Sequence, residues 1–184
     1  VTNDIAHTAE LTYLLNNSGR DIVYSISNAA PFNLAEDWSN LTNAWRTTGD
    51  IKDSWCSMTT IGFLQDKWQP FAGPGSWNDP DMLIVGNVGW GKGIHPTNLT
   101  PDEQYTHISL WCILAAPLLI GCDMEKMDEF TLSILSNPEV LAVNQDAAGI
   151  QGRRVYADKD KEVEVWSKPL SDGTVAVGLF NLSD

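Results

Sequence analysis

WRTTGDI at residues 45–51 and WNDPDML at residues 77–83 are the two stretches on which the prediction of the fold rests. Each is a short strand-like run with a carboxylate near its end, and the two lie about one strand-helix-strand repeat apart. The first also contains an arginine and a tryptophan. Carboxyl groups that move protons, a guanidinium that holds hydroxyls and an aromatic face that covers a pyranose are what a sugar-cleaving pocket needs. The two stretches therefore predict a carbohydrate pocket.

Composition and charge restrict the class of protein. The 184 residues are 43% apolar and include eight tryptophans, enough to fill the core of one domain or of a piece of a larger one. A net charge of −13 argues against a nucleic-acid partner, because such binding neutralises phosphates with Lys and Arg. The most apolar run, 113–120, is too short to cross a bilayer, so no membrane partner is expected. The polar start at residues 1–4, without Met or a signal pattern, is expected to be a cut.

Outside the two stretches, helical and strand-like segments alternate. The clearest boundary is a predicted capping box, in which Thr100 caps a helix, Pro101 takes the first helical position and Glu103 completes the box. Repeated strand-helix units predict a parallel sheet with right-handed crossovers, either half of an eight-stranded barrel or most of a doubly wound sheet. Helices are predicted at 2–17, 36–43, 54–65, from 101 onward and at 130–136, and strands at 21–26 (buried on both faces), 44–51, 81–85 and 117–121.

The pattern changes after residue 146. Two apolar runs, 163–166 and 175–180, are separated by a stretch that contains Ser-Asp-Gly, which predicts an antiparallel hairpin. We therefore predict a first domain over residues 1–146 and the beginning of an antiparallel β domain over residues 147–184. Because only two strands of that domain are predicted, the end of the chain is also expected to be a cut.

Candidate catalytic groups follow from strand ends, because function in a parallel barrel lies at the carboxyl ends of the strands. Asp50 ends its predicted strand, and Arg46 lies four residues earlier, so both side chains can point to one side. The alternative for Asp50 is a cap on the following helix. Asp79 and Asp81 either satisfy loop amides or, in the case of Asp81, face the pocket. Met82 either fills the core or lines a sugar-binding wall.

The histidines and cysteines predict no triad and no metal site. The histidines, which stand far apart, favour surface or core roles. The cysteines lack the spacing of metal ligands and are predicted to be apolar core fillers. These residues are His7, His95 and His107, and Cys56, Cys112 and Cys122.

Four motifs in this order resemble the melibiase-type α-galactosidases of glycoside hydrolase family 27. They occupy residues 45–51, 73–83, 116–123 and 143–146, so the resemblance covers nearly the whole chain. It implies a (β/α)8 TIM barrel, of which strands five to eight are present, followed by the start of an antiparallel β domain. It also implies a retaining enzyme that removes terminal α-linked galactose from oligosaccharides or glycoconjugates through a covalent glycosyl-enzyme on an aspartate.

The resemblance also implies roles for individual residues. Asp50 matches the acid/base, Arg46 matches an arginine that contacts sugar hydroxyls near C2 and C3, and Asp81 and Met82 match pocket-lining positions. The family's nucleophile lies in a Lys-Tyr-Asp-type motif on the fourth strand, and this motif does not occur here, so the nucleophile is expected shortly before Val1. The fragment alone is expected to be inactive. No metal or organic cofactor is implied, because two carboxylates suffice for the chemistry.

One departure from the family affects which sugar is expected as the substrate. Relatives commonly have Cys, then Glu or Asn, then Trp at the end of the first strand present here, where this chain has Ser27-Asn28-Ala29. By the resemblance, Ser27 and Asn28 border the C2 side of the sugar. The alternatives to plain α-galactose are therefore an α-N-acetylgalactosaminide, a β-L-arabinopyranoside or another α-linked sugar.

Two rival interpretations come from other classes. A non-catalytic carbohydrate-binding remnant would need a partner or a homodimer to cover raw sheet edges. A nucleotide-binding doubly wound domain is disfavoured, because no Gly-rich phosphate loop follows any predicted strand. The family and four sequons imply an extracellular or secretory location. The sequon asparagines are Asn16, Asn40, Asn98 and Asn181.

Overall fold

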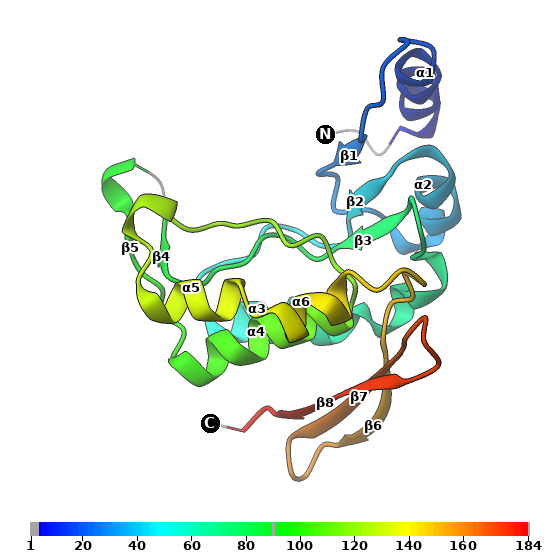
Figure 1. The fold of residues 1–184 in the computed structure, drawn as a ribbon. Coiled ribbons are helices and arrows are strands. Elements are labelled where there is room, and N and C mark those ends of the chain that lie inside the picture. The colour runs from blue at the N-terminus through cyan, green and yellow to red at the C-terminus, as the bar shows by residue number, and fades with distance from the viewer. Residues whose placement is uncertain (1–3, 90, 184) are drawn as a thin grey trace.

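A parallel sheet forms the first part of the molecule (Figure 1). The structure, a computed structural model, describes residues 4–89 and 91–183. The three strands lie in chain order, and Ala44 on the middle strand pairs with Ser25 on one side and with Trp77 on the other. The strands are β1 (Ser25–Ile26), β2 (Ala44–Arg46) and β3 (Trp77–Asp79).

A fourth parallel segment follows β3 in space. Leu83 forms a parallel bridge with Ile120, in which its N–H donates to the Leu119 carbonyl at 2.8 Å and its carbonyl accepts from the Gly121 N–H at 3.1 Å. The chain therefore lays down four successive parallel segments whose carboxyl ends share one edge, as predicted. Among the described residues, the strand expected at 117–121 is reduced to one isolated bridge, at Ile120.

The regular strands are shorter than predicted or lie at other positions. The strand predicted at 44–51 ends at Arg46, because residues 47–49 turn away into a loop. The strand predicted at 81–85 lies at β3 instead, because Asp81 has a φ of 91° and interrupts regular pairing there. The segment 21–26 was expected to be buried on both faces, but Ile22 and Val23 are exposed, and β1 is an edge strand in the described part of the chain.

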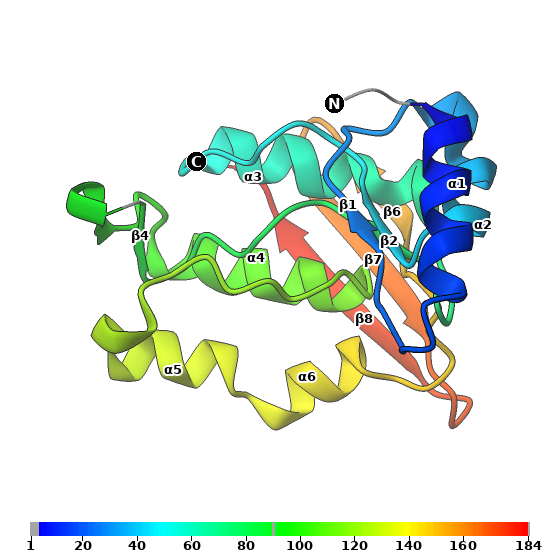
Figure 2. The same cartoon turned by 90° about the horizontal axis from the view of Figure 1, so that it is seen from above.

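Most predicted helices are present (Figure 2). The capping box is confirmed: the Thr100 hydroxyl accepts from the Glu103 N–H at 3.3 Å, and the Thr100 N–H donates to the Glu103 carboxylate at 2.6 Å. The helix predicted at 2–17 is shorter, and Thr2 and Asn3 lie outside the described residues. The helices are α1 (Ile5–Asn16), α2 (Ala35–Leu41), α3 (Trp55–Gly62), α4 (Pro101–Ile113), α5 (Glu129–Leu135) and α6 (Pro138–Asn144), of which α6 was not predicted.

The 3₁₀ segments and a small hairpin complete the first part of the chain. The helix predicted at 54–65 is α3 followed directly by a 3₁₀ helix, η2 (Phe63–Phe71). An antiparallel hairpin that the sequence analysis missed consists of β4 (Asn87–Val88) and β5 (His95–Pro96). Shorter 3₁₀ turns are η1 (Phe32–Leu34), η3 (Gly91–Gly93) and η4 (Met124–Lys126).

The C-terminal part is an antiparallel sheet that packs against α4 (Figures 1 and 2). The predicted hairpin is confirmed as β7 (Val163–Pro169) paired with β8 (Val175–Asn181), and β6 (Arg153–Asp158), which was not predicted, pairs with β7. Trp166 and Phe180 join the large apolar core around α4, where both rings lie against Phe63.

Lys168 on β7 joins the C-terminal sheet to two helix ends. Its side chain is fully buried, and its ammonium group donates to the Val143 carbonyl and, at 3.5 Å each, to the carbonyls of Cys112 and Asn144. These carbonyls lie at the C-termini of α4 and α6, where a cation is favoured by the helix dipole. Burial lowers the pKa of Lys168, and the nearby Asp146 carboxylate opposes that shift. The domain division at residue 146 stays a prediction.

The cysteine prediction is correct for one residue of three. Cys112 on α4 is buried, Cys122 is half-buried and Cys56 is exposed. Cys56 is exposed because α3 turns Met58 and Ile61 to the core and Cys56 to solvent. Among the residues that the structure describes, no helix is both long enough and apolar enough to cross a membrane.

Replacing Lys168 with Met tests the buried ammonium group. We expect Lys168→Met to lower the free energy of unfolding by about 1–3 kcal/mol, because three buried carbonyls lose their donor while the side-chain length is kept. The free energy of unfolding is measured by urea titration of the full-length protein. Lys161→Met, at an exposed residue in the β6–β7 turn, is the control and should change the free energy by less than about 0.5 kcal/mol. Equal midpoints for both variants would contradict this role.

Candidate active site

Arg46 holds two carboxylates at the shared edge of the parallel segments. Its Nη2 lies 2.6 Å from the Asp81 carboxylate and 3.2 Å from that of Asp50. Arg46 is the last residue of β2, and its register partner on β3 is Asp79. The carboxyl ends of adjacent parallel strands therefore bring together Arg46, Asp50 and Asp81, which the sequence analysis selected.

The two carboxylates that contact Arg46 differ in exposure. The Asp81 side chain is 5% exposed, whereas that of Asp50 is 94% exposed. Asp81 accepts further hydrogen bonds from the N–H groups of Ile51 at 2.8 Å and Met82 at 2.7 Å. Asp50 does not cap the next helix, because Ser54 is the N-cap of α3. Asp81 is thus a fixed carboxylate, and Asp50 is free to reach a ligand.

The backbone of Asp81 is held in a strained conformation. A φ of 91° is rare for a residue with a side chain and typically costs about 1–3 kcal/mol, so its surroundings must impose it. The Asp81 N–H donates to the Asp79 carboxylate at 2.8 Å, and its carbonyl accepts from the indole N–H of Trp111 at 2.8 Å. One helical turn before Trp111, the imidazole Nε2 of His107 accepts from the Ile84 N–H at 3.1 Å. Two side chains of helix α4 therefore form hydrogen bonds with the backbone of the segment that carries Asp81.

Burial perturbs two titratable groups behind the site. The pKa of the Asp79 carboxyl is raised by burial, against the opposing effects of the Asp81 N–H and the Arg46 charge. Burial lowers the pKa of His107 to about 3. His107 is therefore neutral, as its role as an acceptor for Ile84 requires, and of the surface or core roles expected for the histidines it has the core one.

A cavity of about 480 Å³ opens in front of these residues. Four predicted site residues line it, namely Arg46, Asp50, Asp81 and Met82. The sequence analysis missed two other polar residues of the lining, Asp53 and His95; Asp53 follows Asp50 by three residues, and His95 belongs to the unpredicted hairpin. The remaining lining residues are Ile51, Ile84, Val88, Gly89 and Gly121.

The other two predicted site residues do not line this cavity. Ser27 is exposed, and Asn28 is buried beside β2, where the following loop is fixed by a 2.7 Å hydrogen bond from the Ala30 N–H to the Arg46 carbonyl. Within the described residues, neither amide atom of Asn28 has a hydrogen-bond partner, and the same is true of the Arg46 Nε. These buried polar atoms are unusual, because most such groups are paired. In the same part of the chain, no group of three His, Cys, Asp or Glu residues is arranged to hold a metal ion.

Comparison with known proteins covers both parts of the chain. A family model described as Alpha galactosidase A matches residues 3–146, and a model of the Alpha galactosidase A C-terminal beta sandwich domain matches residues 149–184. Alpha-galactosidase 2 of Arabidopsis thaliana is 48% identical over 172 residues, which are 94% of this chain and 41% of that relative. Human Alpha-N-acetylgalactosaminidase is 39% identical, with 91% of this chain and 41% of the relative covered.

Solved structures show the same likeness. The crystal structure of a family 27 β-L-arabinopyranosidase from Geobacillus stearothermophilus matches with a TM-score of 0.89 at 34% identity, covering 97% of this chain and 42% of that one. The α-galactosidase of Saccharomyces cerevisiae matches with a TM-score of 0.83 at 31% identity, covering 96% and 44%. The chain thus spans about two fifths of the length of the relatives it matches.

The buried His107 makes a prediction about acid stability. Its pKa is about 3 in the folded protein and 6.5 in the unfolded chain, so its contribution is complete above pH 6.5 and is lost as the pH falls toward 3. In His107→Gln, the amide oxygen can accept from the Ile84 N–H without titrating. We expect the free energy of unfolding of the wild type to fall more steeply over this interval, by up to about 4 kcal/mol relative to the variant.

Urea titrations of both proteins across this pH interval provide the measurement. His7→Gln, at an exposed histidine on α1, is the control and should follow the wild type. Parallel pH profiles for wild type and His107→Gln would show that His107 is not buried in its neutral form.

Proposed function

The chain belongs to glycoside hydrolase family 27 and carries part of its (β/α)8 barrel followed by part of its antiparallel β domain, and on this basis we propose that the protein is a retaining α-galactosidase. The observation that supports the proposal most is the pair of carboxylates on Arg46, one fixed and one exposed. Terminal α-linked galactose is the proposed substrate, and a carbohydrate is the proposed partner.

In the proposed mechanism, Asp50 is the acid and then the base. Its exposed carboxyl group protonates the glycosidic oxygen while a nucleophilic aspartate attacks the anomeric carbon from the opposite face. Asp50 then deprotonates the water that releases the sugar from the glycosyl-enzyme. We infer that an aspartate outside residues 1–184 is the nucleophile, because the family's Lys-Tyr-Asp-type motif does not occur among them. In retaining enzymes the two carboxyl groups lie about 5–5.5 Å apart.

In this proposal, Arg46 and Asp81 form a preorganised binding site for sugar hydroxyls. Both side chains are buried and fixed by each other, so binding a substrate requires little reordering. The guanidinium donates and the carboxylate accepts, which suits adjacent hydroxyls on a pyranose. Met82 supplies an apolar part of the wall.

A second sugar is favoured by a specific observation. Arg46 lines the cavity, and its Nε is a buried polar atom with no hydrogen-bond partner among the described residues, so a substituent of the sugar that accepts a hydrogen bond could satisfy it. This fits a substrate with a different group at C2, such as an α-N-acetylgalactosaminide, and the human relative is named for that activity. A β-L-arabinopyranoside is the third candidate, as in the Geobacillus stearothermophilus relative.

We also propose a secretory or extracellular location. The proposal rests on the family and on four exposed sequon asparagines. One of them, Asn98, donates from its side-chain amide to the Asp53 carbonyl at 3.1 Å and so also has a structural role.

Asp50→Asn tests the acid/base role in the protein at its encoded length. The amide keeps the size of the side chain but supplies no proton, so we expect kcat on an α-galactosyl disaccharide to fall at least about 100-fold. The loss should be smaller on a nitrophenyl α-galactoside, whose leaving group needs less protonation. Asp160→Asn, in the exposed β6–β7 turn, is the control. A near-normal rate on the disaccharide would refute the assignment.

A panel of nitrophenyl glycosides tests the sugar. We expect the wild type to hydrolyse the α-D-galactoside with a kcat/KM at least about tenfold above those for the other two glycosides. Faster hydrolysis of the N-acetyl-α-D-galactosaminide or the β-L-arabinopyranoside by the wild type would replace galactose as the substrate.

A further inference from the structure

The β4–β5 hairpin forms one wall of the active-site cavity. Val88 and His95 are paired across the hairpin, and both line the cavity with Gly89. Gly89 has a φ of +107°, and a Cβ at this position would collide with the carbonyl oxygen of Gly93. Among the described hairpin residues that line the cavity, His95 is the polar one.

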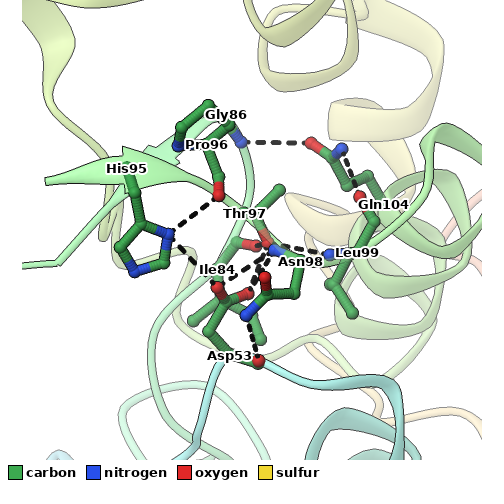
Figure 3. A network of polar contacts seen from close by, with 9 residues as sticks. All are labelled: Asp53, Ile84, Gly86, His95, Pro96, Thr97, Asn98, Leu99 and Gln104. Atoms are coloured by element: carbon green, nitrogen blue, oxygen red, sulfur yellow. Dashed lines mark hydrogen bonds and ion pairs between the residues drawn. The ribbon is translucent and has the colours of Figure 1, made fainter.

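Asp53 attaches this hairpin to the loop that carries Asp50 (Figure 3). Its carboxylate accepts from the Thr97 hydroxyl at 2.6 Å and from the Asn98 N–H at 3.0 Å. In return, the Asn98 side-chain amide donates to the Asp53 carbonyl. Because Asp53 is three residues from Asp50, these contacts fix the position of the hairpin relative to the proposed acid/base.

Two further sets of contacts fix the hairpin. The Gly86 N–H, at its base, donates to the side-chain oxygen of Gln104 on α4 at 3.1 Å (Figure 3). On the opposite side, the Asn87 carbonyl accepts from the Asp123 N–H at 2.7 Å, and the Asn87 side chain donates to the Lys126 carbonyl at 2.9 Å. Three separate segments thus hydrogen-bond to the described residues of the hairpin and next to it, and they hold it as one wall of the cavity.

The imidazole of His95 is oriented by its neighbours. Its Nδ1 lies 2.8 Å from the Pro96 carbonyl oxygen, which can only accept, so Nδ1 carries the proton. The Asp53 carboxylate lies 3.8 Å from the same nitrogen. In the neutral ring, Nε2 is then a hydrogen-bond acceptor, and Figure 3 shows it on the edge of the ring that points away from this network. The side chain is half-exposed, so a ligand in the cavity can reach it.

The cavity therefore has two polar ends joined by the loop at residues 50–53. At one end Arg46 contacts Asp81, and at the other Asp53 lies beside His95. In a glycosidase the acid must face the oxygen of the leaving group. If Asp50 is the acid, the sugar that is attacked lies at the Arg46 end, and the leaving group extends along the hairpin.

We propose that this hairpin wall is a subsite for a sugar leaving group and that the Nε2 of His95 accepts a hydrogen bond from one of its hydroxyls. The proposal rests on the proposed glycosidase function. It makes His95 a specificity-determining residue: it distinguishes substrates whose leaving group is a sugar from those whose leaving group lacks a hydroxyl at that place. The chemical step is unchanged, because His95 moves no proton.

The test compares two substrates in the protein at its encoded length. For His95→Ala and His95→Phe, we expect kcat/KM to fall about 3- to 10-fold on an α-galactosyl disaccharide, mainly through KM, and to stay unchanged on the nitrophenyl α-galactoside. His95→Gln, whose side-chain oxygen can accept, should recover most of the loss. His7→Ala is the control, and melting temperatures identify any variant that is misfolded.

The outcomes separate the two proposals. An active wild type with equal losses on both substrates, or with no loss on either, overturns the subsite and leaves the glycosidase function standing. A wild type inactive on every glycoside overturns the proposed function and the subsite with it. If the Ala variant misfolds, the comparison of Phe with Gln decides, because both fill the space and only Gln restores an acceptor.

Discussion

The ion pair between Arg46 and Asp81 is the constraint on which the rest of the site depends. Both side chains are buried, and removing two charges from water costs free energy unless their hydrogen bonds are satisfied. Asp81 meets that condition by also accepting from Ile51 and Met82. To do so from the end of β3, its backbone takes a φ that few residues with side chains adopt. The site is thus organised around one fixed carboxylate.

Helix α4 supplies the hydrogen bonds that hold this arrangement in place. Near its N-terminus Gln104 accepts from the base of the β4–β5 hairpin, and farther along His107 and Trp111 bind the backbone at Ile84 and Asp81. At its C-terminus the Cys112 carbonyl accepts from Lys168 of the C-terminal sheet. One helix therefore connects the cavity wall, the fixed carboxylate and the antiparallel sheet, which explains why so much of it is buried.

The sequence predicts the convergence of the charged residues better than it predicts the elements that carry them. Arg46, Asp50 and Asp81 follow strand-like runs, and parallel strands bring such ends together whatever their length. Strand limits depend on backbone conformations such as that of Asp81, which leave no periodic signal. The β4–β5 hairpin was missed because its Gly-rich turn lies between strands of two residues each. His95 reaches the cavity only through that hairpin, so its role was not predictable from spacing.

The charges of the cavity also restrict the chemistry of its ligand. Its lining includes three carboxylates, those of Asp50, Asp53 and Asp81. Among the described lining residues, Arg46 is the one Lys or Arg, and it already pairs with two of these carboxylates. An anionic sugar, such as a uronate or a sugar phosphate, would meet uncompensated carboxylates there. In the proposed glycosidase, a neutral pyranose avoids that repulsion, and the same carboxylates stabilise the positive charge that develops on it in an oxocarbenium-like transition state. For that proposed function, the acidity of the cavity discriminates twice, against charged substrates in binding and in favour of glycoside cleavage in the transition state.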